Sequence, residues 1–246
     1  MLRIGITEAG DAGRHLEWTT AMDTVHAAIL ITKAVTDEFL AAVEAFRVRV
    51  MVHVTVTGYG GSLVEPGAPS AEWSRRQYDR LARILSPERT VLRVDPIIPT
   101  TKGLVTADAV LRLFEDSGVQ RVRYSFLDMY PHVRVRFQAA GLPDPYQGGF
   151  GPAPSQIEAA QRALAPWRAR YRFESCAERG VDQVGCLSVR DGGPLGFETG
   201  AFSGSSHQRA GCLCPKNKVQ LLYHRGRCEH GCPYCYWRDP SAEGER

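Results

Sequence analysis

The chain alternates between short apolar runs and longer segments in which apolar residues recur every three or four positions. A short apolar run bounded by turn residues is typical of a buried strand, whereas the longer spacing is typical of an amphipathic helix. Seven runs predict strands, at residues 2–7, 26–32, 48–57, 90–94, 119–126, 171–175 and 218–224.

Four of the segments between these runs combine helical spacing with an N-terminal cap. The predicted caps are Thr36, Ser70, Thr106 and the capping box Ser155-Gln156-Ile157-Glu158. The apolar stripes that follow them contain Phe39, Leu40, Val43 and Phe46; Trp73, Leu81 and Leu85; Ala107, Val110, Leu111 and Phe114; and Ile157, Ala160, Leu164 and Trp167. Each stripe predicts one face packed against a sheet.

Strands that alternate with helices favour parallel βα units in an α/β fold. We expect these units to form a TIM-like barrel, partial or complete, with an open doubly wound sheet as the alternative. Residues 1–178 are predicted to form the body of the barrel. Residues 179–246 are predicted to be a Cys-rich, cluster-binding segment that completes it.

In either architecture the reactive residues lie at the carboxyl ends of the strands. The polar and ionisable residues predicted there are Glu8, Asp11, Thr32, Lys33, Thr57, Tyr59, Arg93, Asp95, Ser125, Asp128, Tyr130, Glu174 and Glu178. Any one of them taken alone is equally well explained as a helix cap or a solvated loop residue. Their recurrence at the same end of successive strands favours a site.

Lys33, Arg93 and Asp95 are the best candidates among them for catalysis or substrate binding. Arg93 and Asp95 are two residues apart and therefore project to the same side of one strand. They fit a reactive pair and a core ion pair about equally well.

Composition adds few constraints beyond a globular core. The 43% hydrophobic content supports such a core, and the net charge of +3 is too small to impose binding to nucleic acid or a membrane. The N-terminus turns polar after six residues, and no apolar run approaches the roughly 20 residues that span a bilayer. We therefore expect a cytoplasmic protein with no membrane partner.

The seven cysteines all lie at or after position 176. In a reducing compartment, clustered thiols bind metal more often than they form disulfides. Cys228, Cys232 and Cys235 form the pattern CxxxCxxC immediately after the last predicted strand. Structural zinc sites usually bring cysteines in CxxC pairs with four ligands, so three thiolates at this spacing suit an iron-sulfur cluster better.

The CxxxCxxC pattern, with Tyr234 before its third cysteine, resembles the signature of radical SAM enzymes. The resemblance implies that the three cysteines bind three irons of a 4Fe-4S cluster and leave the fourth iron for S-adenosylmethionine. Reductive cleavage then yields a 5'-deoxyadenosyl radical that acts on a small-molecule or unknown substrate. A reductase or a flavodoxin-type protein would donate the electron. The cofactor-binding residues expected on this basis are Tyr234, Tyr236, Ser125, Asp128, Glu174 and Glu178.

A second resemblance covers nearly the whole chain. The segments VDPII (94–98), SFLDMY (125–130), ESCAE (174–178) and 228–236 are similar to a bacterial family known as domain of unknown function eighteen-forty-eight, as are residues 32–33 and 57–60. That family carries a radical-SAM-like cysteine cluster at its C-terminus. The first loop departs from the family pattern, because residues 7–11 keep only an acid.

The cysteine loop follows the last strand here, whereas ordinary radical SAM proteins carry it after the first. A circular permutation explains this difference, since chain termini often lie close together. It predicts that the strand at 219–224 lies beside the strand at 2–7. It also predicts that the three thiols converge at the carboxyl ends of the strands.

The remaining cysteines are Cys176, Cys186, Cys212 and Cys214. Four thiolates can close a second 4Fe-4S cluster, which we favour, or a structural zinc site, and free or redox-active thiols are the third alternative. His207, His224 and His230 are also near in sequence, but packing explains them better than metal ligation.

The main alternative function is a non-catalytic or nucleic-acid-associated iron-sulfur or zinc protein. The basic clusters at 75–76, 121–123 and 134–136 could contact phosphates, but their alternation with apolar residues fits outer faces of helices and strands better. A third alternative is a zinc-stabilised barrel hydrolase that uses Asp95, Asp128, Glu174 and Glu178. It lacks a clear set of histidines at the strand ends.

Overall fold

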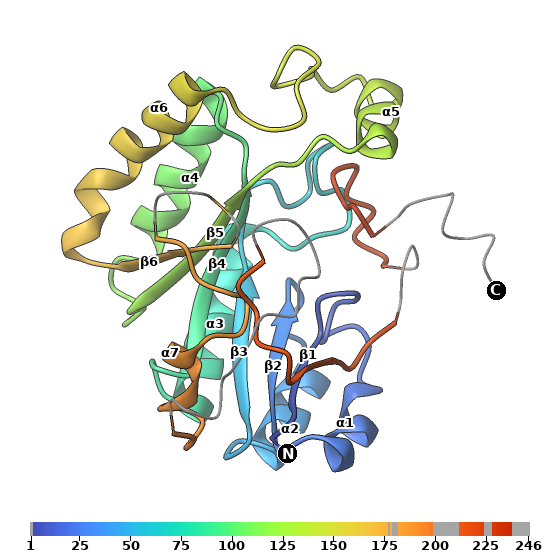
Figure 1. Cartoon of the computed structure of the whole chain (residues 1–246), viewed down its shortest axis with the longest axis vertical. Helices are drawn as coiled ribbons and strands as arrows, with labels where there is room; N and C mark the ends of the chain where they lie inside the picture. Colours follow the sequence, from blue (N-terminus) through green and yellow to red (C-terminus); the bar gives the residue numbers. More distant parts are fainter. Residues whose placement is uncertain (1, 177, 179–181, 199–211, 224–227, 238–246) are drawn as a thin grey trace.

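The computed structural model describes residues 2–176, 178, 182–198, 212–223 and 228–237. Its described strands form one all-parallel sheet in the order β6-β5-β4-β3-β2-β1-β7 (Figure 1). The strands are β1 (Ile4–Ile6), β2 (Ala27–Thr32), β3 (Val50–Thr55), β4 (Thr90–Ile97), β5 (Arg121–Phe126), β6 (Arg172–Ser175) and β7 (Lys218–Gln220). The predicted α/β class with parallel βα units is confirmed.

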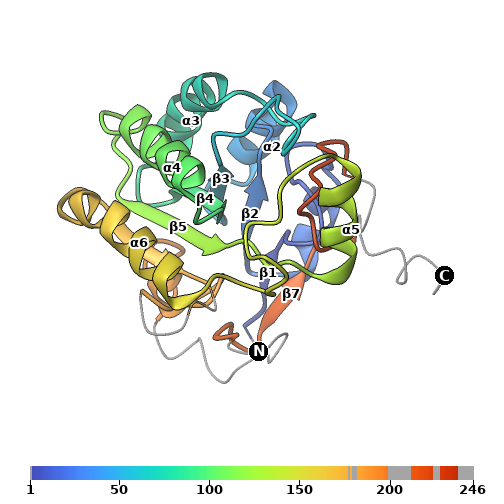
Figure 2. The ribbon, with the colours of Figure 1, turned by 90° about the horizontal axis from the view of Figure 1, so that it is seen from above.

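The longer helices pack on one face of this sheet, as the view from above shows (Figure 2). They are α2 (Asp37–Ala45), α3 (Ala71–Leu85), α4 (Thr101–Leu113) and α6 (Pro154–Leu164). The remaining helices are α1 (Trp18–Ala21), α5 (Pro131–Ala139), α7 (Val189–Gly192) and the 3₁₀ helices η1 (Met22–Thr24) and η2 (Ala165–Ala169). None of the helices in the described part of the chain combines the length and apolar character needed to cross a membrane.

The two faces of the sheet are both buried, but by different partners. On the outer face, strand residues such as Leu30, Val52 and Leu92 join the helices in the main core. On the inner face, Ile29, Met51 and Val91 pack against Cys186, Leu187, Leu195 and Cys214, which belong to the connection between β6 and β7. This connection therefore takes the place that helices occupy on the outer face.

The strand order follows the chain from β1 to β6, and β7 then lies on the other side of β1 from β2. Closure into the predicted barrel, however, is not seen among the described strands, where β6 pairs with β5 and β7 pairs with β1. The chain after β6 folds back along its free edge, where Ser175 N–H donates to the Asp182 carbonyl and Val184 N–H donates to the Ser175 carbonyl. These bonds use backbone groups that a closing strand would need.

The last strand lies where the permutation predicts it. β7 pairs in parallel with β1, with Ile4 opposite Lys218 and Ile6 opposite Gln220 (Figure 2). Gly5 allows the chain beyond β7 to approach closely, because a Cβ at this position would lie 2.4 Å from Leu221 Cδ1. The strand ends at Gln220, four residues earlier than predicted.

Two predicted helix starts are wrong. α4 begins after Thr100, whose side chain accepts from Gly103 N–H, whereas the hydroxyl of Thr106 donates to a carbonyl inside the helix. α6 begins at Pro154 rather than within the box at 155–158, because Pro154 occupies the first turn and the Gln156 side chain accepts from Ala153 N–H. Both errors placed the cap at a Ser or Thr that lies inside the helix.

Candidate functional site

A cavity of about 550 Å³ opens at the carboxyl ends of the strands. Six consecutive strands each contribute a residue from their end or from just beyond it, and these residues are Glu8, Lys33, Thr55, Asp95, Ser125 and Cys176. A smaller cavity of about 130 Å³ adjoins it and shares Glu8, Lys33, Thr55, Tyr234 and Cys235 with it. The predicted gathering of polar residues at this end of the sheet is thus observed.

The three cysteines of the CxxxCxxC loop all line the smaller cavity, and Cys235 also lines the larger one. The loop, red in Figure 1, lies near α5 beyond the strand ends. Burial raises the pKa of Cys228 to about 11 and that of Cys232 to about 12. The loop thus lies where the permutation predicts it, with its three cysteines in one cavity at the carboxyl ends of the strands.

His230 fastens this loop to two other parts of the molecule. Its Nδ1 lies 3.0 Å from the Gly67 carbonyl, and its Nε2 lies 2.7 Å from Asp11 Oδ2. The Gly67 N–H in turn donates to the His230 carbonyl at 3.0 Å. The ring is only 2% exposed, so His230 is a packed anchor, as expected. His207 and His224 lie outside the described residues.

Asp11 is the buried centre of that anchor. It accepts hydrogen bonds from Gly13 N–H, the Thr32 hydroxyl and Lys33 N–H in addition to its contact with His230. Burial opposes ionisation of Asp11, but the His230 hydrogen bond and charge outweigh it and lower the pKa. A carboxylate therefore joins the β1 loop, the end of β2 and the cysteine loop.

Lys33, Glu65 and Tyr234 form a second buried group beside the thiols. Lys33 Nζ lies 2.9 Å from Glu65 Oε1, and the Tyr234 hydroxyl donates to the same oxygen. Burial lowers the pKa of Lys33, but Glu65 and then Cys232 raise it above its ordinary value. Burial raises the pKa of Glu65, but Lys33 lowers it below the ordinary value. The group is therefore an ion pair that orients the Tyr234 ring.

Arg93, Asp95 and Ser125 line the larger cavity from adjacent strands. Asp95 pairs with Arg93 and accepts from the Ser125 hydroxyl. Burial opposes protonation of Arg93, but Asp95 and Cys186 raise its pKa above the ordinary value. Arg93 and Asp95 therefore form an ion pair and also line the cavity.

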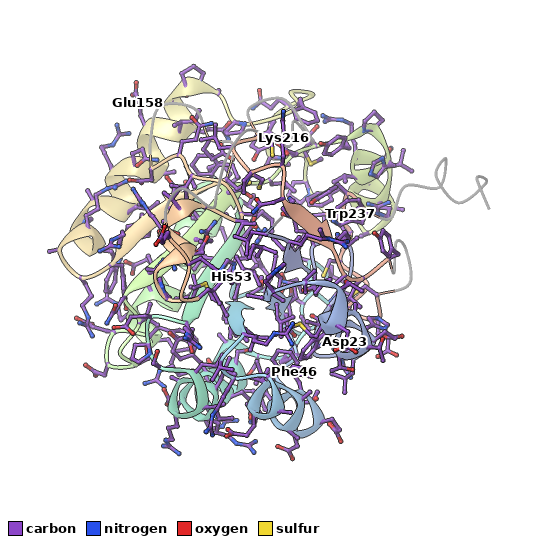
Figure 3. The ribbon with its side chains drawn as sticks, turned by 60° about the horizontal axis from the view of Figure 1, so that its bottom comes forward. Asp23, Phe46, His53, Glu158, Lys216 and Trp237 are labelled. Atoms are coloured by element: carbon purple, nitrogen blue, oxygen red, sulfur yellow. The ribbon has the colours of Figure 1, made fainter. Side chains whose placement is uncertain are left out.

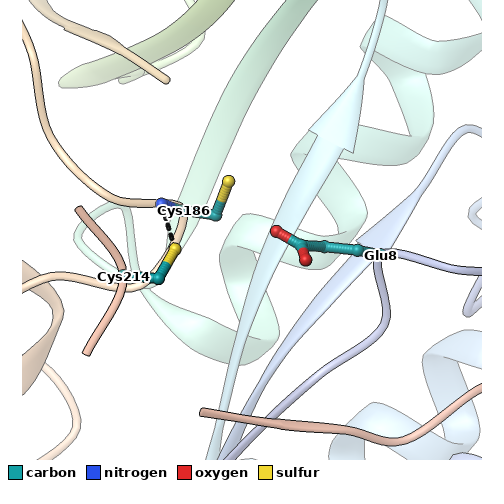
Figure 4. A group of neighbouring side chains, drawn as sticks. All are labelled: Glu8, Cys186 and Cys214. Atoms are coloured by element: carbon teal, nitrogen blue, oxygen red, sulfur yellow. Dashed lines mark hydrogen bonds between the residues drawn. The ribbon is translucent and has the colours of Figure 1, made fainter. Parts of the chain in front are cut away.

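The other four cysteines, Cys176, Cys186, Cys212 and Cys214, line the larger cavity together. Cys176 Sγ lies 3.1 Å from Cys186 Sγ, and Cys186 N–H donates to Cys214 Sγ at 3.2 Å. The carboxylate of Glu8 points toward Cys186 and Cys214 (Figure 4). Ligand atoms of these three residues lie within 4.8 Å of one another, the one such group of His, Cys, Asp or Glu found in the described residues.

Charges around this thiol group are strongly coupled. Lys218 Nζ lies 2.7 Å from Glu8 Oε2 and 3.5 Å from Cys214 Sγ. Burial and then Cys186 raise the pKa of Glu8 to about 7, although Lys218 opposes the rise. Hydrogen bonds from Cys176 and Cys214 hold the pKa of Cys186 well below its usual range, and the pKa of Cys214 rises correspondingly.

The remaining predicted cofactor-binding residues divide into two sets. Asp128, Tyr234 and Tyr236 line the larger cavity, as does Ser125. Glu174 is fully buried away from the lining, where it pairs with Arg121 and Arg123. Glu178 is also absent from the lining, and its carboxylate accepts from Phe126 N–H at 2.9 Å. Glu174 and Glu178 therefore contact residues of β5, and neither lines the larger cavity.

The prediction that residues 121–123 lie on an outer face is wrong. Arg121 and Arg123 are 5% and 4% exposed, and Asp191 joins Glu174 in pairing with both of them. Nearby His53 is fully buried at the centre of the molecule (Figure 3), and burial and then Arg123 lower its pKa well below 6.5. Arg121 and Arg123 are therefore ion-paired inside the protein and do not form a surface for phosphates.

Arg136, in the third basic cluster, contacts the cysteine loop. Its guanidinium donates to the Pro233 carbonyl at 2.9 Å and to the Cys235 carbonyl. Arg134 pairs with Asp144 and donates to the carbonyls of Gly148 and Gly149. Arg136 therefore fixes α5 to the segment that carries Cys235.

Glu65, Lys218 and Asp191 contribute to these groups but do not follow from the sequence pattern. Glu65 lies in the long connection after β3, where nothing local marks it. Lys218 begins β7 and reaches the site through its long side chain, which is 2% exposed. A Lys or Glu becomes recognisable as buried only once its distant partner is known.

Comparison with known proteins identifies a family. No curated protein matches the chain. A family model described as Domain of unknown function (DUF1848) matches residues 12–237. That match covers all seven cysteines and the lining of both cavities except residues 8–11, and the chain therefore belongs to this family.

Proposed function

We propose that this chain is a radical SAM-type iron-sulfur enzyme. In this proposal Cys228, Cys232 and Cys235 bind a 4Fe-4S cluster, and the larger cavity takes S-adenosylmethionine and a substrate of unknown identity. The observation that carries the proposal is the return of β7 to the edge of β1, which brings the three thiols to the carboxyl ends of the parallel strands.

The residues around the smaller cavity fit such a cluster. No fourth cysteine lines that cavity among the described residues, so a cluster held there keeps one iron without a protein thiolate. Cys232 is buried, so a cluster bound there would compensate the charge of its thiolate. Lys33 adds a buried positive charge beside Cys232.

The larger cavity fits a nucleoside-sized cofactor. Its volume of about 550 Å³ lies within the range of about 300–1,000 Å³ that is usual for small-molecule sites. Asp95, Ser125 and Asp128 supply polar groups, and Tyr236 and Trp237 supply aromatic surface. When bound, the reduced cluster supplies the electron for reductive cleavage of S-adenosylmethionine.

The protein's own residues hold the loop in place. His230 ties the loop to Asp11, Arg136 ties it to α5, and Glu65 fixes Tyr234. All three contacts come from elements distant in sequence, so they hold the loop at the carboxyl ends of the strands. Arg93 and Asp95 form an ion pair at the cavity wall, where they can bind polar groups of a substrate.

The proposal is tested by cluster assembly and its response to cofactor. Protein reconstituted anaerobically and reduced should give a 4Fe-4S electron paramagnetic resonance signal that changes when S-adenosylmethionine is added. The triple variant C228A/C232A/C235A should lose this signal, whereas C212S, altered outside the smaller cavity, should keep it. A signal that is unaffected by S-adenosylmethionine would favour the non-catalytic alternative.

A further inference from the structure

The second thiol group lies in the larger cavity, apart from the CxxxCxxC loop. A four-iron cluster binds each thiolate to a different iron, so its thiolates are spread further apart than ligands of a single ion. Around one tetrahedral zinc, with Zn–S of about 2.3 Å, neighbouring sulfurs lie about 3.8 Å apart. The grouping of Glu8, Cys186 and Cys214 within 4.8 Å of one another fits a single ion better than a cluster. Cys176 lies outside that group, but its Sγ is 3.1 Å from Cys186 Sγ, so a small movement of its side chain can supply the fourth ligand.

We propose that Glu8, Cys176, Cys186 and Cys214 form a binding site for one divalent metal ion, with zinc as the ion. Thiolate-rich tetrahedral sites suit zinc, and a carboxylate is an accepted fourth ligand. The assignment replaces the expected second 4Fe-4S cluster and leaves Cys212 outside the ligand set. It does not depend on the proposed radical SAM activity.

Charge supports the assignment. Three thiolates and one carboxylate around a divalent ion leave a net charge of about −2, which burial penalises unless cations compensate it. Lys218 and Arg93 provide that compensation: Lys218 contacts Glu8 and Cys214, and Arg93 faces Cys176, Cys186 and Glu8. The Lys218 side chain is 2% exposed, a burial that requires anionic partners.

The four ligands come from the two sides of the sheet, because Glu8 and Cys214 flank the paired strands β1 and β7, whereas Cys176 and Cys186 lie beside β6. Glu8 follows β1 and Cys176 follows β6, at opposite sides of the sheet, whereas Cys186 and Cys214 lie in the connection that covers the inner face. An ion bound by all four residues would connect the β6 edge of the sheet to the β1–β7 edge. The site is therefore structural, and its loss should loosen the inner face.

The test uses the full-length triple variant C228A/C232A/C235A, purified anaerobically with a thiol reductant, so that the first site cannot bind metal. We expect about one zinc per chain and no acid-labile sulfide. Cobalt substitution should give the charge-transfer absorption of three thiolates on a tetrahedral ion. Chelation should lower the melting temperature.

Two added substitutions test the ligand set. E8Q should weaken zinc affinity by about ten-fold or more, and C212S should leave it unchanged. Iron with stoichiometric sulfide, a Cys176–Cys186 disulfide in place of metal, or absence of any bound ion would overturn the proposal. Loss of zinc in C212S with retention in E8Q would overturn the assignment of Glu8. The cobalt spectrum is measured in C228A/C232A/C235A without either further substitution. The proposal can therefore be tested even if the variant with E8Q or C212S does not fold.

Discussion

At the residue scale, the site is built from buried ionic groups whose members are distant in sequence. Sequence position identified Lys33, Arg93, Asp95 and Ser125 because each lies at a strand end. Glu65 could not be identified, since its burial depends on Lys33 and Tyr234, which lie 32 and 169 residues away. Alternation also misplaced Arg121, because both faces of this parallel sheet are buried and the pattern does not distinguish them.

Substitution of Glu65 should reveal the cost of leaving Lys33 unpaired. E65Q removes the negative charge that faces Lys33 Nζ at 2.9 Å, in a pair whose side chains are 13% and 3% exposed. We expect a loss of about 3 kcal/mol in the free energy of unfolding, measured by urea denaturation. The exposed pair Arg47–Glu44 supplies a control, since E44Q should change stability by no more than about 0.5 kcal/mol.

The difference in the free energy of unfolding between the wild type and E65Q should depend on pH. The folded-state pKa of Glu65 lies below the ordinary value of 4.5, because Lys33, Thr57 and Tyr234 outweigh the effect of burial. The stabilisation is therefore fully present above pH 4.5 and is lost as the pH falls through the folded pKa. A stability difference between wild type and E65Q that stays constant down to acid pH would contradict the ion pair.

At the element scale, β7 is the feature on which the site depends. The sequence predicted its existence and its neighbour, because a permuted chain must return its cysteine loop to the N-terminal strand. Its early end at Gln220 could not be predicted, since residues 221–222 continue the apolar run into the core and Leu221 N–H still donates to the Ile6 carbonyl. Helix starts were missed for a local reason, because Ser and Thr inside a helix resemble caps in sequence.

Gly5 should be intolerant of a side chain because of this strand. A Cβ there would lie 2.4 Å from Leu221 Cδ1, and Leu221 is 7% exposed and cannot move freely. G5V should therefore destabilise the protein by about 2 kcal/mol and reduce iron bound after reconstitution, as measured by denaturation and metal analysis. G193A is the matched control, because a Cβ at Gly193 meets nothing within 4 Å. Full stability and iron content in G5V would show that β7 does not depend on this close approach.

At the scale of the whole molecule, the sheet brings two groups of thiols to one end and keeps them in adjoining cavities. The division of seven cysteines into three and four was predictable from spacing alone. The open edge of the sheet at β6 was not predictable. Whether the sheet closes depends on how the connection after β6 packs, and the hydrogen bonds of this connection to Ser175 have no signal in the sequence. The short distances within the second group likewise appear only in three dimensions.

Release of 5'-deoxyadenosine tests the central claim most directly. Protein carrying an intact 4Fe-4S cluster, reduced with dithionite and supplied with S-adenosylmethionine, should release 5'-deoxyadenosine and methionine, detected by chromatography and mass spectrometry. C228A/C232A/C235A should release neither, and G193A, whose added Cβ meets nothing within 4 Å and which lines neither cavity, should behave as the wild type. Absence of 5'-deoxyadenosine from protein whose cluster is shown to be intact and reduced would contradict the account.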